Sequence, residues 1–193
     1  MRSSNRALFR FWGVAPDNVF ARLPQLRGRR ISVSYRPHLT AWRGELLSRS
    51  HKGDAVYAGC FLRKRRIVLD QQMVKTPRVL ERIFVHEVFH FVWSRLARDL
   101  RESYELMILS EIQASTRGEL GWSAESLKIK LSAQEIATRN RKWKDYLCES
   151  FCDTGGWLYG TATRYSEMTL DRASRDLRRA WIRENIETRP ITI

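Results

Sequence analysis

The segment IFVHEVFHFVW, residues 83–93, places His86, Glu87 and His90 inside an otherwise apolar run. A run of this composition is expected to be buried, and burying ionisable side chains without partners is costly in free energy. The chain must therefore fold so that something compensates these three side chains. A metal ion is the leading candidate.

The spacing of the three residues fits a zinc site on a helix. His86 and His90 are four residues apart, so both imidazoles project from one face about one turn apart and can reach the same ion at about 2 Å. Glu87 lies beside them and can act as a general base without being a ligand, which is the HExxH arrangement. The alternative is two core histidines that satisfy each other, with Glu87 at the surface. Apolar residues surround nearly the whole helix, and this favours burial of Glu87 too.

A third protein ligand is needed, and the segment CESFCDTGGWLYG (148–160) offers Glu149. Asp153 lies four residues later on the same helical face, where it can accept a hydrogen bond from the outer nitrogen of a ligand histidine. Glu111 is the alternative third ligand. Ser115 stands four residues after it, where an outer carboxylate would be expected, and we therefore prefer Glu149.

HExxH followed on a later helix by E-x-x-x-D resembles the gluzincin group of zinc metallopeptidases. The resemblance implies a Zn²⁺ ion held by His86, His90 and Glu149, with Asp153 as an outer partner of a ligand histidine. It also implies that Glu87 is the catalytic base and that the substrate is a peptide or protein. The expected fold is then zincin-like.

The group that stabilises the oxyanion is left open by this resemblance. Such enzymes often use a Tyr, His or Arg beyond the third-ligand helix, and the candidates are Tyr159, Tyr165, Arg164 and His38. The strands before the motif fit the upper zincin subdomain, in which an edge strand pairs with the substrate. We expect that edge along residues 55–62, where Gly59 permits close approach.

The pattern along the chain predicts one α+β domain over residues 1–193, with a β-rich part at about 1–75 and a helical part at 76–193. A small antiparallel or mixed sheet is expected to precede the mostly helical C-terminal part. Alternation of apolar and polar residues predicts strands at 29–35, 54–62 and 65–70, the last two forming a hairpin.

Capping signals and apolar periodicity predict helices over 76–100, 102–116, 132–161 and 170–187, and a short helix capped by Ser123. Gly156 and Gly160 are expected to let the third-ligand helix lie close to the motif helix. In the last helix the arginines are expected to face solvent. Its expected core residues are Leu170, Ala173, Leu177 and Trp181.

The chain carries 35 Lys and Arg against 21 Asp and Glu, a net charge of +14. Such an excess favours contact with acidic partners, nucleic acid among them. The basic residues are dispersed over many segments, which favours non-specific attraction over a defined site. One alternative to a peptidase is therefore a zinc-binding regulatory protein that binds nucleic acid or a transcription factor. Another is a zincin relative without turnover.

Three cysteines, Cys60, Cys148 and Cys152, are too few for a disulfide framework, and we expect the last two to be small core residues in a reducing compartment. No apolar run reaches the length of a membrane span. Arg10 interrupts the N-terminal apolar stretch, which makes a signal peptide unexpected. These features predict a cytoplasmic protein. Oligomeric state and cleavage preference leave no signature in the sequence.

Overall fold

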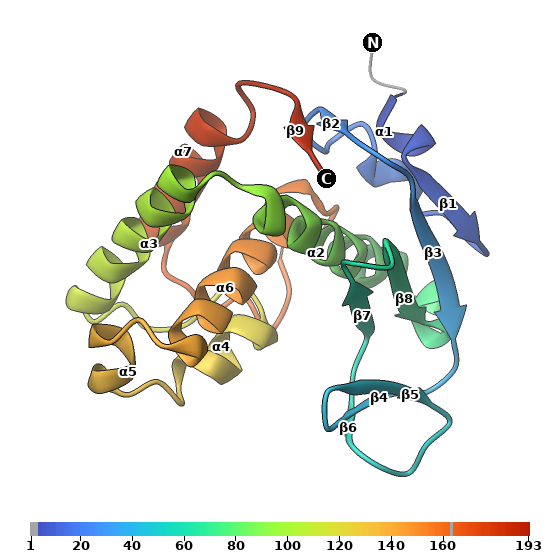
Figure 1. Cartoon of the computed structure of the whole chain (residues 1–193), viewed down its shortest axis with the longest axis horizontal. Helices are drawn as coiled ribbons and strands as arrows, with labels where there is room; N and C mark the ends of the chain where they lie inside the picture. Colours follow the sequence, from blue (N-terminus) through green and yellow to red (C-terminus); the bar gives the residue numbers. More distant parts are fainter. Residues whose placement is uncertain (1–3, 163) are drawn as a thin grey trace.

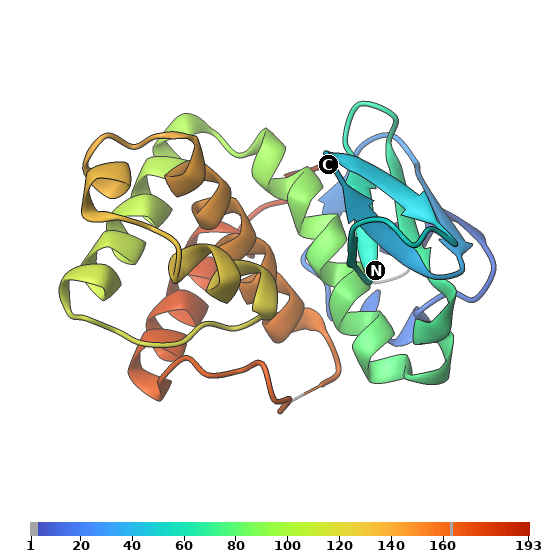
Figure 2. The same ribbon diagram turned by 90° about the horizontal axis from the view of Figure 1, so that it is seen from below.

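The computed structural model describes residues 4–162 and 164–193 and has an α+β architecture arranged around helix α2 (Pro77–Arg95). Figure 2 shows the strands on one side of α2 and the other large helices on its opposite side. The predicted α+β class is confirmed. The mixed sheet and the helices share one hydrophobic core, to which α2 contributes Phe84, Val88 and Phe89.

The sheet against α2 has four strands in the order β1-β3-β8-β7. Three of them are parallel: β1 (Phe9–Trp12), β3 (Ile31–Arg36) and β8 (Arg66–Asp70). β7 (Ala58–Phe61) pairs antiparallel with β8 and forms one edge. Ile31 and Val33 alternate with Ser32 and Ser34 along β3, so that the apolar side chains face the core.

Two smaller sheets complete the β part. β4 (Leu39–Trp42), β5 (Glu45–Ser48) and β6 (Asp54–Ala55) form an antiparallel sheet that projects from the body of the molecule (Figure 1). β2 (Leu26–Arg27) pairs with β9 (Ile191–Thr192). The end of the chain therefore returns to the β-rich part, which the division at residue 76 did not anticipate. The predicted strand 54–62 is two strands, β6 and β7, in different sheets.

The remaining helices are α1 (Ser4–Ala7), α3 (Arg98–Gln113), α4 (Trp122–Lys128), α5 (Ala133–Ala137), α6 (Arg141–Tyr159) and α7 (Arg172–Asn185), with short 3₁₀ turns at Asp17–Val19 and Gln71–Lys75. None of the helices in the described parts of the chain combines the length and apolar character of a membrane span.

Two predicted helix boundaries are wrong because the backbone breaks at residues with no strong stop signal. α2 ends at Arg95, since Leu96 and Ala97 take extended ψ values of 138° and 154°. The capping box of Ser132 with Glu135 is confirmed, but it opens only the short helix α5. Arg139 then adopts a positive φ, and Asn140 caps the separate helix α6.

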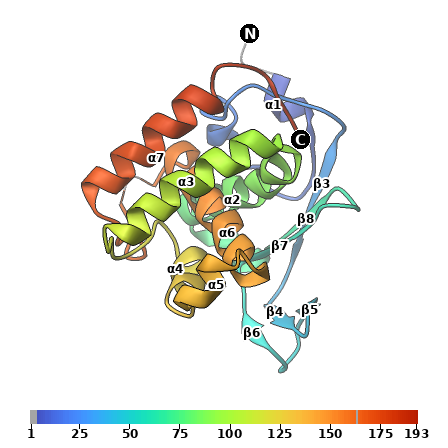
Figure 3. The same cartoon turned by 60° about the vertical axis from the view of Figure 1, so that its left-hand side comes forward.

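α6 packs closely along α2, as Figure 3 shows, and glycines make this approach feasible. A Cβ added at Gly156 would lie 3.1 Å from the backbone oxygen of Arg82, which confirms the role predicted for Gly156. The tightest contact is at its neighbour Gly155, where a Cβ would lie 2.3 Å from the ring of Phe89. Gly160 caps the end of α6.

The predicted inward face of α7 is partly wrong. Trp181 and the preceding Leu170 are buried, but Ala173 is exposed and Leu177 is 54% exposed. The side chains that point inward instead include Arg178, which is fully buried. A buried guanidinium needs acidic partners, and α7 is held by that requirement as much as by apolar packing.

Candidate metal centre

The predicted ligands come together where α6 faces α2. Glu149 contacts both imidazoles, through Oε2 to His86 Nε2 at 3.2 Å and through Oε1 to His90 Nε2 at 3.7 Å. The two ring centroids are 4.9 Å apart. The structure thus brings Glu149 of α6 to two histidines that lie on α2, far earlier in the chain.

Asp153 lies on the outer side of His86, as predicted. Its Oδ1 accepts a hydrogen bond from His86 Nδ1 at 2.8 Å, which leaves Nε2 of this ring directed toward Glu149. Its Oδ2 accepts a hydrogen bond from the backbone N–H of Ala124 at 3.0 Å. Both carboxylate oxygens are therefore fixed, and the orientation of the imidazole is fixed with them.

Helix α4 begins at this carboxylate, so the predicted cap at Ser123 is wrong. The N-cap position is Gly121, and Asp153 from α6 accepts the N–H that a capping side chain would otherwise take. A Cβ at Gly121 would lie 2.4 Å from the Asp153 carboxyl group. A side chain from another helix thus replaces the local cap and requires glycine there.

Glu111 is engaged elsewhere. Its two oxygens accept hydrogen bonds from Nε and Nη2 of Arg178 at 2.9 and 2.6 Å. Arg178 also donates to Glu119, from Nη1 at 2.8 Å and Nη2 at 3.2 Å. Glu111 therefore neutralises a buried arginine, and the preference for Glu149 agrees with the geometry.

Glu87 is buried next to the two histidines and lines the hollows in front of them. Burial raises its pKa above the ordinary value, and the neighbouring His90 and His86 oppose this rise. A carboxyl group whose pKa is raised toward neutral pH is suited to accept a proton and to return it. Glu87 therefore combines a position beside both histidines with a raised pKa.

Neighbouring opposite charges favour the ionised forms of Glu149 and His86. Burial opposes ionisation of Glu149, but the hydrogen bond and charge of His86 outweigh it and lower the pKa of Glu149 to about 2. Burial likewise lowers the pKa of His86, yet the charge of Asp153 outweighs it and leaves that pKa well above its usual value. Carboxylates on both sides of one imidazole form an environment that favours a cation.

Two thiols lie on the outer side of His90 and were missed as functional candidates. Cys148 Sγ is 3.5 Å and Cys152 Sγ 3.4 Å from His90 Nδ1. A hydrogen bond from Cys152 lowers the pKa of Cys148 to about 6 despite the opposing effect of burial. The sequence did contain a sign of this position, because each cysteine immediately precedes one of the two predicted carboxylates, Glu149 and Asp153.

The donor atoms fit zinc by type. Two imidazole nitrogens and one carboxylate oxygen are the protein ligands of many catalytic zinc sites. In the described part of the chain, the triads whose donors lie within 4.8 Å of one another are His86–His90–Cys152 and His90–Cys148–Glu149. The set His86–His90–Glu149 is more open, so binding one ion would require small shifts of these side chains.

Two adjoining hollows give access to the centre. The larger, of about 910 Å³, and the smaller, of about 350 Å³, share His86, Glu87, Ser123 and Ala58. Residues 55–58 line the larger hollow and residues 58–60 the smaller one. Edge strand β7 therefore runs past Glu87. Gly59 lines the smaller hollow, but its missing side chain would point to the other side of the strand, where a Cβ would lie 2.9 Å from Leu46.

Of the four oxyanion candidates, His38 lines the larger hollow together with Glu87. The hydroxyl of Tyr159 donates to Glu187 and that of Tyr165 to the backbone oxygen of Leu120, and Arg164 is exposed. Arg82 was not predicted but also lines this hollow. Its guanidinium stacks on the Tyr165 ring at 4.4 Å and donates to Glu167 at 2.6 Å.

No family model, curated protein or solved structure matches this chain.

Proposed function

We propose that the protein is a cytoplasmic zinc-dependent peptidase with a zincin-like fold. The observation that carries the proposal is the pair of contacts from Glu149 to Nε2 of both motif histidines, with Asp153 on the outer nitrogen of His86. This is the arrangement expected of HExxH followed by E-x-x-x-D. The resemblance to gluzincins supports the same assignment.

His86, His90 and Glu149 would hold the metal. A zinc ion bound there supplies a Lewis acid and lowers the pKa of a coordinated water to about 7. Glu87 takes the proton of the attacking water, holds it within the buried centre and transfers it to the departing amine. Asp153 keeps the His86 ring in the required tautomer.

The substrate is an extended peptide segment that adds to the edge of the sheet along β7. The free edge of a strand supplies backbone donors and acceptors for such pairing. The two hollows on either side of Glu87 accommodate residues on each side of the scissile bond. His38 and Arg82 carry donors on the wall of the larger hollow, and we assign the oxyanion role to one of these two.

The purified protein is expected to bind close to one zinc per chain and to cleave peptides from a mixed library. Chelation should abolish cleavage, and one added equivalent of zinc should restore it. Elemental analysis and mass spectrometry of the library measure both. If chelated protein takes up no zinc, the metal site is wrong. Zinc uptake without cleavage would instead favour a zinc-binding protein without turnover.

Alanine substitutions of Asp153, Glu149 and Glu111 are expected to change the zinc affinity by different amounts. Asp153→Ala should weaken zinc affinity about 10–100-fold, because the His86 ring loses its outer partner. Glu149→Ala should weaken it more, since it removes a ligand. Glu111→Ala should lower the stability of the fold but leave the zinc affinity of the folded protein near that of the wild type.

Competition titration against a chromogenic chelator measures this order, at a temperature where circular dichroism shows each variant folded. A general loss of stability would not rank the variants in this way. If Glu111→Ala loses zinc while Glu149→Ala and Asp153→Ala retain it, the third ligand has been assigned to the wrong helix.

A further inference from the structure

The four-stranded sheet has a second face, turned away from α2 and from the candidate metal centre. The strand register places polar and aromatic side chains there, opposite the apolar ones: Arg10, Trp12, Ser34, Arg36, Phe61 and Arg66. Asp70 falls on the same face by register, but it is buried and its carboxylate accepts hydrogen bonds from the backbone N–H groups of Leu39 and Gln72. On β7, Cys60 lines the hollow of the metal centre, and the next residue, Phe61, lines a hollow on this other face. One strand therefore separates the two surfaces.

The hollow on this outer face has a volume of about 480 Å³ and lies between the sheet and the β4–β5 hairpin. Arg36, Arg49 and Arg66 line it, together with serine and apolar side chains and no acidic residue. No ion pair among the described residues engages any of the three arginines. The hollow is thus cationic and has no internal neutralising group.

One detail indicates that this cationic hollow receives a ligand. Nε of Arg66 is buried without a hydrogen-bond partner in the described parts of the chain, a condition that native proteins rarely leave uncompensated. An anionic group in the hollow would supply the acceptor that Arg66 Nε lacks, and the exposed Arg36 and Arg49 line the same hollow.

Aromatic side chains accompany the arginines on the same side of the molecule. The guanidinium of Arg66 lies 4.5 Å from the ring centre of Phe61, and that of Arg10 lies 4.4 Å from the ring of Trp12. Trp12 is 58% exposed. A flat sheet surface that combines cations with exposed rings can hold a phosphate chain and stack its bases.

We propose that this outer sheet face binds single-stranded nucleic acid. Arg36, Arg49 and Arg66 hold backbone phosphates, and the exposed ring of Trp12 stacks on a base. Base stacking on a side chain requires an unpaired base, which favours a single strand over a duplex. The net charge of +14 adds long-range attraction. The proposal is independent of the metal centre.

The test is fluorescence anisotropy with a labelled oligothymidylate over a range of salt concentrations. The variant Arg36→Ala/Arg49→Ala/Arg66→Ala should bind at least about tenfold more weakly. Its plot of log affinity against log salt should be shallower by about 2, since each phosphate contact to a single strand contributes about 0.7. Trp12→Ala should lose about tenfold in affinity, with the salt dependence unchanged.

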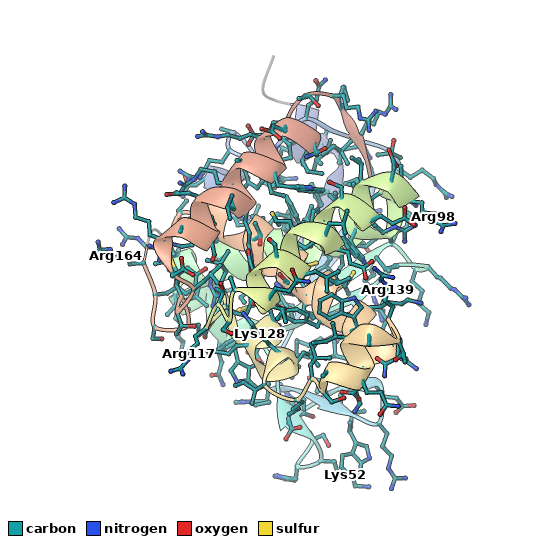
Figure 4. The ribbon with its side chains drawn as sticks, turned by 90° about the vertical axis from the view of Figure 1, so that its left-hand side faces the viewer. Lys52, Arg98, Arg117, Lys128, Arg139 and Arg164 are labelled. Atoms are coloured by element: carbon teal, nitrogen blue, oxygen red, sulfur yellow. The ribbon has the colours of Figure 1, made fainter. Side chains whose placement is uncertain are left out.

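A matched control removes the same number of charges from the helical side. Arg98, labelled in Figure 4, is exposed there, as are Arg101 and Lys144. Arg98→Ala/Arg101→Ala/Lys144→Ala should bind the oligonucleotide within about threefold of the wild type, because general attraction alone is reduced. Thermal melts confirm that each variant is folded.

Equal losses in the two triple variants would overturn the proposal, since binding would then follow net charge alone. So would a duplex that binds as tightly as the single strand, or binding of pyrophosphate without binding of the oligonucleotide. Parallel titrations with oligouridylate distinguish RNA from DNA as the source of the phosphate chain. Tighter binding of either one supports the proposal.

Discussion

The Glu87→Gln protein is expected to cleave peptides about 10²–10⁴-fold more slowly than the wild type while it retains its zinc. Glutamine has nearly the same shape as glutamate but cannot accept the proton of the attacking water. Glu87 is not one of the proposed ligands, so the metal should remain bound. Initial rates on a peptide selected from the library, together with elemental analysis, measure both properties.

Glu102→Gln is a suitable control, because Glu102 lies on the surface of α3 in an exposed pair with Arg98. Such a pair contributes little to stability, and the control should cleave at the wild-type rate. A Glu87→Gln protein that cleaves as fast as the wild type would refute the role of general base. Loss of zinc in this variant would show that Glu87 acts as a ligand.

Arg178→Met is expected to lower the free energy of unfolding by about 3–5 kcal/mol at neutral pH. The substitution leaves Glu111 and Glu119 buried without the guanidinium that neutralises them. Methionine fills most of the space, so the loss reports on charge more than on packing. Urea unfolding followed by circular dichroism gives the value. Arg183→Met, at an exposed position of α7, should be nearly neutral.

The loss should depend on pH in a defined direction. In the wild type, burial alone would raise the pKa of Glu119, but Arg178 outweighs burial and lowers this pKa below its usual value. A lowered pKa stabilises the fold above the ordinary Glu pKa of about 4.3, and this stabilisation is lost as the pH falls through the folded value. In Arg178→Met the buried carboxyl group of Glu119 has lost the charge that most lowers its pKa, and burial then favours its protonated form. The variant therefore takes up its proton at a higher pH than the wild type, and the stability difference should begin to shrink above the ordinary Glu pKa of about 4.3 and continue to shrink as the pH falls through the wild-type value. A constant difference would contradict the charge explanation.

Local patterns in the sequence determined the parts of the centre that lie within one helix. Four-residue spacing places His86 and His90 on one face of α2, and the same spacing places Glu149 and Asp153 on one face of α6. Thr76 and Pro77 mark the start of α2 for reasons that involve only neighbouring residues. The α+β class also followed from local periodicity, because alternation and helical repeats depend on short segments.

Only the tertiary structure decided which carboxylates meet which partners. The sequence favoured Glu149 over Glu111 only through the residue four positions later, and it gave no sign that Arg178, far along the chain on α7, binds Glu111. The start of α4 was missed for the same reason, since its capping group is Asp153 from α6. The position of the thiols beside His90 and the inward turn of Arg178 likewise depend on how helices pack. Spacing along a chain fixes neighbours within one element, whereas contacts between elements depend on the positions of residues distant in sequence.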